Sequence, residues 1–213
     1  MDKLIGDMEQ AIIAGDKERC VELAKQAVAK KLDPAEVLEK GFGKGMQVLG
    51  DQFEKGEVFL PELLFAEDAM TSAMEILKPA IEAAGTDLGK KGKVVIGTIS
   101  GDVHDIGKNI VKMFLSVSGF QIFDLGRDVP VKNYIDAAKK ESAGIIAASA
   151  LMTTTMVYMP ELIKQLGELG IRKNHKVMVG GAPVIQSWAE QIGADGYGLT
   201  AKQAVEVATK LAR

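Results

Sequence analysis

The sequence predicts an α + α/β protein: a four-helix bundle followed by a flavodoxin-like five-stranded parallel sheet with helices on both faces. Three observations support this fold class. Apolar residues recur at three- and four-residue steps from Leu4 to Leu77, strands and helices alternate five times after Lys93, and a glycine-rich segment separates the two patterns. The first pattern is typical of amphipathic helices that form bundles, and the second of parallel sheets covered by helices.

Four helices are expected in the first half of the chain. The first two should span residues 2–14 and 16–31, the third should begin at Pro34, and the fourth should begin near Pro61. The third contains Gly41, Gly43 and Gly45, and each glycine inside a helix costs roughly 1 kcal/mol relative to alanine. Two explanations stay open. Either another backbone approaches these glycines closely, or the helix is locally weak.

Residues 84–92 are polar, rich in glycine and poorly periodic, which is typical of a linker between domains. We therefore place a helical cap domain at residues 1–86 and a sheet domain at residues 87–213, with Gly85–Gly92 as a candidate hinge.

The second half contains short β-branched runs, which predict strands at 93–99, 119–125, 143–149, 176–179 and 196–199. Helices are expected between and after them, at 106–118, 131–141, 157–169, 184–192 and 201–212. The strands are apolar with little alternation, so both faces of the sheet should be buried.

In an open parallel sheet, ligands bind beyond the carboxyl ends of the strands, where the strand order reverses. For the flavodoxin-like order this point lies between the first and third strands. The informative loops are therefore residues 100–109, 149–155 and 180–183. They offer one histidine, several hydroxyl groups and a pair of glycines that lets a ligand approach the backbone.

The loop after the first strand contains His104, and Asp102 stands two residues before it. The sequence lacks GxGxxG after this strand, has Ser149 where a receiver domain needs an aspartate, and has only one cysteine. A single imidazole suits axial ligation of a metal that is already held by a macrocycle, with Asp102 accepting the other ring N–H. The alternative is that His104 is only a loop histidine.

Composition excludes several classes. The formal charge is −3 and the sequence pI about 5.6, so the basic excess of a nucleic-acid binder is absent. The single Cys20 fits a reducing compartment, and the sequence shows no apolar run long enough for a signal peptide or a membrane span. We expect a cytoplasmic protein that binds neither nucleic acid nor membrane.

Asp102-Val103-His104-Asp105-Ile106-Gly107 resembles the DxHxxG motif of the methylcobalamin-binding family. The resemblance continues at Ser149-Ala150-Leu151 (SxL) and at Gly180-Gly181 (GG). Upstream, a further set looks like the helical cap that precedes this domain in the family, as in cobalamin-dependent methionine synthase: Gly45-Met46, Gly50, Phe53, Gly56 and Phe59-Leu60-Pro61. The resemblance covers residues 5 to 210.

The resemblance implies cobalamin bound base-off and His-on, with His104 as the cobalt ligand and Asp102 and Thr155 forming a hydrogen-bonded chain to it. Thr155 stands where the family usually has serine. The expected cofactor-binding residues are Glu39, Phe53, Leu60, Gly101, Asp102, Val103, His104, Asp105, Ile106, Gly107, Ser149, Leu151, Thr153, Gly180, Gly181 and Ala182. Within this set, the cap residues should cover the methyl-bearing face, and Ser149 and Thr153 should line the pocket for the nucleotide tail.

The resemblance also implies a function: a corrinoid methyl carrier of a multi-component methyltransferase, not catalytic alone. Cobalt would accept a methyl group as Co(I) from a donor-specific methyltransferase. It would pass the group from methyl-Co(III) to an acceptor methyltransferase that uses tetrahydrofolate or a thiol, and a reductive activator would be a third partner. The segment SALMTTTM at 149–156 looks most like the methylamine-type group, while methoxylated aromatics, betaine and methanol stay open as donors.

Three other functions stay open. One is a cobalamin-dependent sensor or regulator, although no DNA-binding segment is visible. Another is the small subunit of an adenosylcobalamin mutase, against which the cap residues Phe53 and Leu60 speak. The third is a flavodoxin-like interaction module without cobalamin, which reconstitution with hydroxocobalamin would distinguish.

Overall fold

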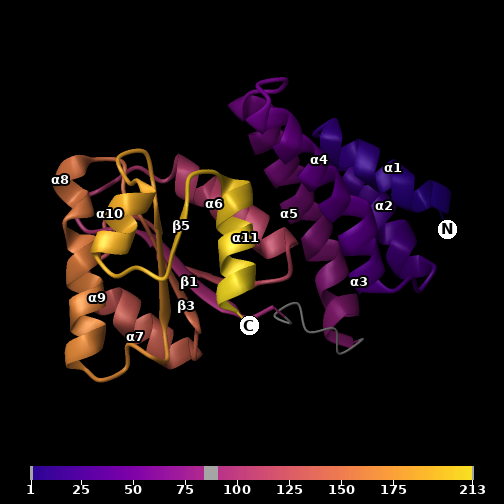
Figure 1. Ribbon diagram of the computed structural model, residues 1–213. Helices are drawn as coiled ribbons and strands as arrows, with labels where there is room; N and C mark the ends of the chain where they lie inside the picture. Colours follow the sequence, from indigo (N-terminus) through magenta and orange to yellow (C-terminus); the bar gives the residue numbers. More distant parts are fainter. Residues whose placement is uncertain (1, 84–90, 213) are drawn as a thin grey trace. The chain divides into compact units, whose positions relative to one another are not determined.

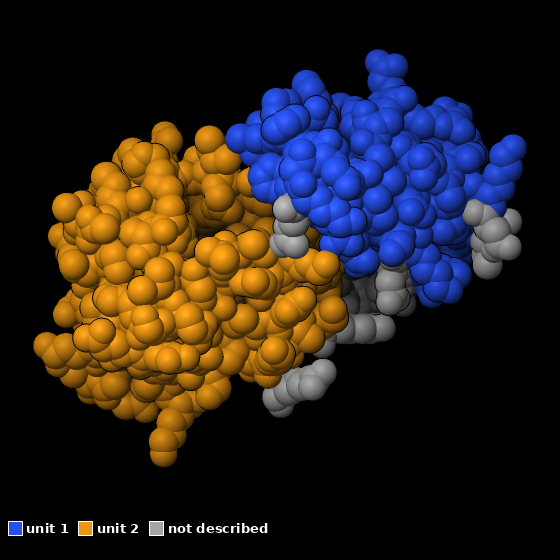
Figure 2. Space-filling view, turned by 45° about the horizontal axis from the view of Figure 1, so that its top comes forward, with its two compact units in different colours: residues 1–88 blue, residues 89–213 orange. Residues whose placement is uncertain are grey.

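The structure is a computed structural model that describes residues 2–83 and 91–212, except for the side chains of Asp2, Ala35, Glu39, Glu54 and Glu82. The chain divides into two compact units, residues 1–88 and 89–213 (Figure 2). The predicted domain boundary after residue 86 and most of the predicted hinge at 85–92 lie outside the described residues.

The first unit is helical (Figure 1). Its elements are α1 (Asp2–Ile13), α2 (Lys17–Ala29), α3 (Pro34–Glu36), the π-helix η1 (Val37–Phe42), α4 (Gly43–Glu54) and α5 (Leu60–Ala83). The four longer helices, α1, α2, α4 and α5, contribute fully buried apolar side chains to the core, among them Met8, Ile12, Leu23, Met46 and Leu63. The predicted helical bundle is confirmed.

The predicted third helix differs in detail. It is one continuous helical stretch in which six residues, Val37–Phe42, form a π-helix between α3 and α4. Gly45 lies against α1: a Cβ at Gly45 would stand 2.6 Å from the carbonyl oxygen of Glu9 and 2.8 Å from Cβ of Ile12. Of the two explanations for the helical glycines, close backbone approach is therefore correct at Gly45.

The second unit is an α/β domain (Figure 1). Its strands are β1 (Lys93–Thr98), β2 (Gln121–Asp124), β3 (Ile145–Ser149), β4 (Lys176–Gly180) and β5 (Gly196–Gly198). Its helices are α6 (Ile106–Val117), α7 (Val131–Glu141), α8 (Thr153–Met156), α9 (Tyr158–Glu168), α10 (Gln186–Gln191) and α11 (Ala201–Leu211).

The strand order is β2-β1-β3-β4-β5, and every neighbouring pair is parallel. One face packs an apolar core against α7, α9 and α10, and the other packs a second core against α6 and α11. The flavodoxin-like fold is therefore confirmed. The details differ in two ways: the short helix α8 occupies what the sequence predicts as a loop after the third strand, and each strand has at least one end shifted by one or two residues from its predicted limits.

No helix in the described parts of the chain combines the length and the apolar character that crossing a membrane requires.

Candidate functional site

The site is built at the carboxyl edge of the sheet, where parallel strands all end on the same side. The loops after β1, β3 and β4 begin at Ile99, Ala150 and Gly181. β1 and β3 are neighbours in the sheet, but the chain leaves β1 for α6 on one face and β3 for α9 on the other. The strand order thus reverses beside β1, and its loop carries Asp102 and His104.

Asp102 joins two of these loops. Its side chain is fully buried and accepts five hydrogen bonds. Oδ1 accepts from the backbone N–H of His104 at 3.1 Å and from its ring Nδ1 at 2.8 Å. Oδ2 accepts from the N–H groups of Leu151 (2.8 Å) and Met152 (3.2 Å) and from the Thr155 hydroxyl (2.7 Å). The carboxylate therefore ties the β1 loop to the β3 loop.

These hydrogen bonds decide the charge of Asp102. Burial by itself would raise the pKa of its carboxyl, because a low-dielectric site disfavours the charged form. Hydrogen bonds from the Thr155 hydroxyl, the Leu151 N–H, and the ring Nδ1–H and backbone N–H of His104 outweigh burial and hold the pKa of Asp102 well below its usual range. Asp102 is therefore an anion at neutral pH and acts only as an acceptor.

The ionised Asp102 fixes the tautomer of His104. Since the carboxylate cannot donate, the proton of their 2.8 Å contact belongs to Nδ1 of His104. The neutral ring then keeps its lone pair on Nε2. The side chain of His104 is 47% exposed, so the ring combines a buried anchor with a nitrogen available for coordination.

The backbone around His104 is held as well. The hydroxyl of Thr98, which is fully buried, donates to the carbonyl of His104 at 2.9 Å. A tight turn follows β1, in which the Asp102 N–H donates to the carbonyl of Ile99 at 3.1 Å. Gly101 takes φ = +77° in that turn, a region that favours glycine.

The β4 loop packs directly on the β3 loop at Gly181. This residue has φ = +114°, and a Cβ there would stand 1.8 Å from the carbonyl oxygen of Ala150. No other residue fits at that position. The second of the two predicted glycines thus allows the close approach of two backbones and holds exposed Ala182 beside the edge.

Several remaining predicted residues offer apolar surface at this edge. Val103, Ile106 and Leu151 are each about half exposed or more, and they come from the β1 and β3 loops. Sequence reasoning missed Ile185 and Leu199, which follow β4 and β5 and are 57% and 70% exposed. Their signal was available, since both come after the carboxyl end of a parallel strand, but neither belongs to a motif.

The other predicted positions are polar or small. Asp105 stands at the N-cap of α6, and Gly107 in its first turn has open space where a Cβ would be. Ser149 and Gly180 end their strands with partly buried residues, while Thr153 begins α8 and is exposed. Sequence reasoning also missed the loop after β2, whose Asp128 accepts from the N–H of Gly101 at 2.7 Å.

Three predicted cofactor residues belong to the helical unit. Phe53, on α4, is 37% exposed, and Leu60 begins α5 with a partly exposed side chain. The side chain of Glu39, within η1, lies outside the described residues.

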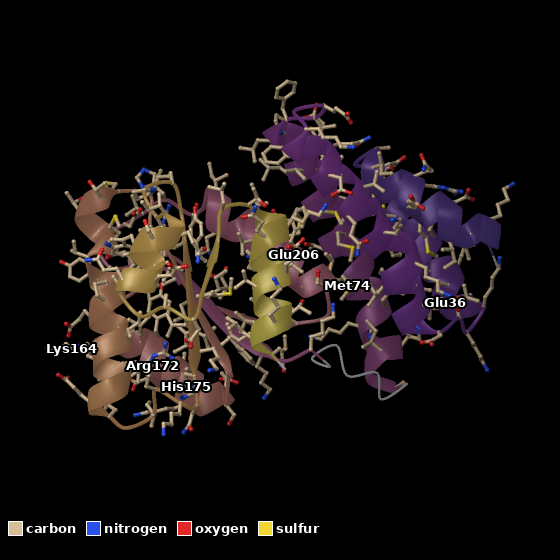
Figure 3. All side chains as sticks on the ribbon, in the orientation of Figure 1. Glu36, Met74, Lys164, Arg172, His175 and Glu206 are labelled. Carbon is tan, nitrogen blue, oxygen red and sulfur yellow. The ribbon has the colours of Figure 1, made fainter. Side chains whose placement is uncertain are left out.

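The other histidine, His175, is not part of this site. It precedes β4 at the edge where the strands begin, and Figure 3 shows it beside Arg172, away from α8. His175 is buried and its Nδ1 lies 2.7 Å from the carbonyl oxygen of Ala143, while its own carbonyl accepts from Arg172. These contacts describe a packed structural histidine.

Comparison with known proteins identifies the family. Residues 92–206 match a family described as B12 binding domain, and residues 4–78 match a second family with the same description. Over 204 residues the chain is 50% identical to trimethylamine corrinoid protein 1 of Methanosarcina acetivorans, covering 96% of this chain and 94% of that protein. The chain belongs to the B12-binding corrinoid protein family.

Solved structures agree with this membership. A cobalamin-binding protein from Desulfitobacterium hafniense DCB-2 is 36% identical to this corrinoid protein, with a TM-score of 0.76 and 96% of each chain covered. A chain of the methanol:cobalamin methyltransferase complex from Methanosarcina barkeri is 35% identical, with a TM-score of 0.84, covering 99% of this chain and 80% of that one.

The edge of the sheet fits a corrinoid. A corrin ring would present a large, mostly apolar face around a metal ion that can accept a nitrogen ligand. The structure offers the free Nε2 of a half-exposed His104, flanked by the exposed apolar side chains of Val103, Ile106 and Leu151. The imidazole nitrogen suits the metal of a corrinoid, and the apolar side chains around it suit the corrin ring.

Proposed function

We propose that this corrinoid protein carries a methyl group on bound cobalamin, with His104 replacing the cofactor's own base as the lower ligand of cobalt. The observation that carries the proposal is the pairing of His104 with Asp102. A fully buried, ionised carboxylate holds Nδ1 and leaves Nε2 free at the edge of the sheet. A carboxylate behind a ligating histidine is the usual support of a metal-bound imidazole.

The bound corrinoid would supply a cobalt ion that takes up a methyl group and gives it away. The chain would tune that ion through His104. The hydrogen bond to Asp102 makes Nε2 a stronger donor, and the hydroxyl of Thr155, 2.7 Å from Asp102, moderates the basicity of the carboxylate. Asp102, His104 and Thr155 thus form the chain through which the protein acts on the metal.

We propose roles for the other residues that the family resemblance marks. Gly101, Val103, Asp105, Ile106, Gly107 and Leu151 would contact the lower face of the corrin. Ser149, Thr153, Gly180, Gly181 and Ala182 would border the nucleotide tail. Glu39, Phe53 and Leu60, in the cap domain at 1–86, would cover the upper face of a corrinoid held by the domain at 87–213.

The donor we propose is a methylamine. Relatives that are 45–50% identical over at least 96% of this chain are named as trimethylamine and dimethylamine corrinoid proteins. The partners would be a methylamine-specific methyltransferase, an acceptor methyltransferase that uses tetrahydrofolate or a thiol, and a reductive activator. The methanol:cobalamin complex named for one structural relative supports docking to a methyltransferase.

Visible spectroscopy of the protein reconstituted with hydroxocobalamin tests the ligand. The wild type should show the spectrum of an imidazole-ligated, base-off corrinoid, and His104→Gly should lose it and regain it with added imidazole. His175→Gln is the matched control, because it removes the only other histidine of the chain. A His104→Gly spectrum equal to that of the wild type would contradict the assignment.

A methyl-transfer assay tests the donor. The reduced, cobalamin-loaded protein is offered trimethylamine, dimethylamine, monomethylamine, betaine, methanol and a methoxylated aromatic, each with its own methyltransferase. Methylation should occur with a methylamine and its methyltransferase. Methylation with methanol or a methyl ether alone would overturn the proposed donor and leave the carrier role standing.

A further inference from the structure

The loop between β2 and α7 lies beside the segment that carries His104. Beyond the last β1–β2 pair, Ile96 and Asp124, the loop continues the hydrogen-bond ladder. The Leu125 N–H donates to Ile96, the Thr98 N–H donates to Gly126, and the Val129 N–H donates to Thr98, at 2.8–2.9 Å. Residues 125–129 therefore run along the end of β1 as an irregular extension of the sheet.

At the end of this loop, Asp128 brackets the turn before His104. Its Oδ1 accepts from the N–H of Gly101 at 2.7 Å, and its own N–H donates to the carbonyl of Asp102 at 2.9 Å. Asp128 thus accepts a hydrogen bond from Gly101 and donates one to Asp102, so it holds two consecutive residues of the turn. Asp128 does this with φ = +53°, a left-handed conformation that residues other than glycine, asparagine and aspartate rarely adopt.

The other side of His104 is tied to the same loop by Asp124. Its Oδ1 accepts from Lys108 Nζ at 2.7 Å and from the N–H of Gly126 at 2.9 Å. Lys108 stands four residues after His104, and its side chain is only 1% exposed. A buried ammonium needs a charged partner, so this ion pair fixes the first turn of α6 against the loop.

We propose that Asp128 is a positioning residue that sets the direction of the His104 ring for axial ligation, with Asp124 fixing the opposite flank; this rests on the function proposed above. Asp102 can aim its carboxylate at Nδ1 of His104 only while its own backbone is held. The Gly101 amide and the Asp102 carbonyl are the two groups that Asp128 holds. A metal–imidazole bond demands a narrow range of ring directions, so loosening this turn weakens ligation.

Three variants separate the carboxylate from the backbone conformation. Asp128→Gly keeps the left-handed backbone at no steric cost and removes the acceptor. Asp128→Asn keeps an acceptor oxygen and tolerates the same backbone. Ser142→Gly is the matched control, because Ser142 also has a φ of +53° but lies at the end of α7, where β3 is about to begin.

The first measurement is the ratio of His-ligated to unligated corrinoid, read from the visible spectrum of the cob(II)alamin-loaded protein. In Asp128→Gly this ratio should fall about three- to tenfold, which is the typical net effect of losing one hydrogen bond. Asp128→Asn should stay within about twofold of the wild type, and Ser142→Gly should be unchanged. An Asp128→Gly ratio within twofold of the wild type, or an equal fall in Ser142→Gly, would overturn the proposal.

The second measurement uses the protein without cofactor. Amide hydrogen exchange at Gly101 should be about tenfold faster in Asp128→Gly and near wild type in Asp128→Asn. Unchanged exchange at Gly101 would also overturn the role of Asp128. The two possible failures can be told apart. If the wild-type protein shows no ligation of cobalt by histidine, the proposed function is wrong. If both the wild type and Asp128→Gly show normal ligation, only the role of Asp128 is wrong.

Discussion

At the scale of single residues, the site depends on one buried anion. Asp102 carries a full charge in a fully buried position because five hydrogen bonds from two loops compensate for its lost hydration. Two of these bonds, from the backbone N–H and the ring Nδ1–H of His104, also orient its ring. Residues that donate to Asp102 therefore affect both the stability of the sheet unit and the direction of the imidazole.

Removal of the Thr155 hydroxyl tests how much such a bond contributes to stability. Thr155→Val keeps the shape of the side chain and leaves Oδ2 of Asp102 without its shortest hydrogen bond. We expect the free energy of unfolding to fall by about 1–3 kcal/mol, while Thr155→Ser, which keeps a hydroxyl, loses at most about 1 kcal/mol. Urea denaturation of the cofactor-free protein measures both.

Thr154→Val is the control for this series, because Thr154 is the exposed neighbour of Thr155 in α8. Its free energy of unfolding should change by less than about 0.5 kcal/mol. Equal losses in Thr154→Val and Thr155→Val would mean that the bond from Thr155 to Asp102 contributes nothing specific.

The sequence could predict part of this residue-scale picture. Asp102, His104 and Thr155 occupy motif positions, and the structure places them in hydrogen-bond contact. Asp128 could not be found in this way, because its contact with Gly101 joins loops 27 residues apart and depends on how the β2 loop extends past its strand. Leu199 could have been found from its place after the carboxyl end of the fifth predicted strand, although it belongs to no motif.

At the scale of elements, glycine positions record where backbones meet. Gly45 of α4 faces the carbonyl of Glu9 in α1, and the space between them has no room for a side chain at this position. The sequence showed that these glycines needed an explanation, and only the packing of α1 supplied it. The π-helix at Val37–Phe42 was not predictable, because apolar residues at three- and four-residue steps fit an α-helix equally well.

Gly45→Ala tests this contact. Alanine favours a helix by roughly 1 kcal/mol over glycine, so the substitution would stabilise an open position. Here the new Cβ would stand 2.6 Å from the Glu9 oxygen and 2.8 Å from the Ile12 Cβ. We expect the free energy of unfolding to fall by about 1–3 kcal/mol. Urea denaturation, monitored by the circular dichroism signal of the helices, measures this change.

Gly6→Ala provides the matched control. Gly6 lies in α1 with nothing within 4 Å of its would-be Cβ, so alanine should stabilise the protein by roughly 0.5–1 kcal/mol. The two substitutions are chemically identical and should have opposite signs. A stabilising Gly45→Ala would contradict the close approach of α1 and α4.

At the scale of the whole molecule, the fold follows from the order of its patterns. Alternating strands and helices predict a parallel sheet, and right-handed crossovers leave few possible strand orders. The order β2-β1-β3-β4-β5 then places the loops after β1 and β3 side by side, which fixes where the site must lie. This much was predictable. The hydrogen bonds that aim the imidazole depend on atomic positions and were only partly so.

The stability of the molecule should depend on pH through Asp124. Burial acts to raise the pKa of its carboxyl, but hydrogen bonds from Lys108, Gly126 and Lys112 lower it below its usual value. The folded state therefore binds the proton less readily than the unfolded state, whose pKa is about 3.9. The stabilisation is present above that pH and is lost as the pH falls through the lower, folded pKa.

Urea denaturation between about pH 6 and pH 3 measures this dependence. In Asp124→Asn the free energy of unfolding should fall less steeply with decreasing pH than in the wild type, although the variant is less stable at pH 6. Asp136→Asn removes an exposed carboxyl that pairs with Lys132, and it should keep the wild-type slope. Parallel curves for the wild type and Asp124→Asn would refute the expected linkage.

The central claim concerns one bond, between Nε2 of His104 and cobalt. The direct measurement is electron paramagnetic resonance of the cob(II)alamin-loaded protein, prepared once with natural histidine and once with ¹⁵N-labelled histidine. If His104 is the axial ligand, the superhyperfine splitting from nitrogen changes from the ¹⁴N to the ¹⁵N pattern. If the splitting keeps the ¹⁴N pattern in the labelled protein, the cofactor's own base is still bound and the account is wrong.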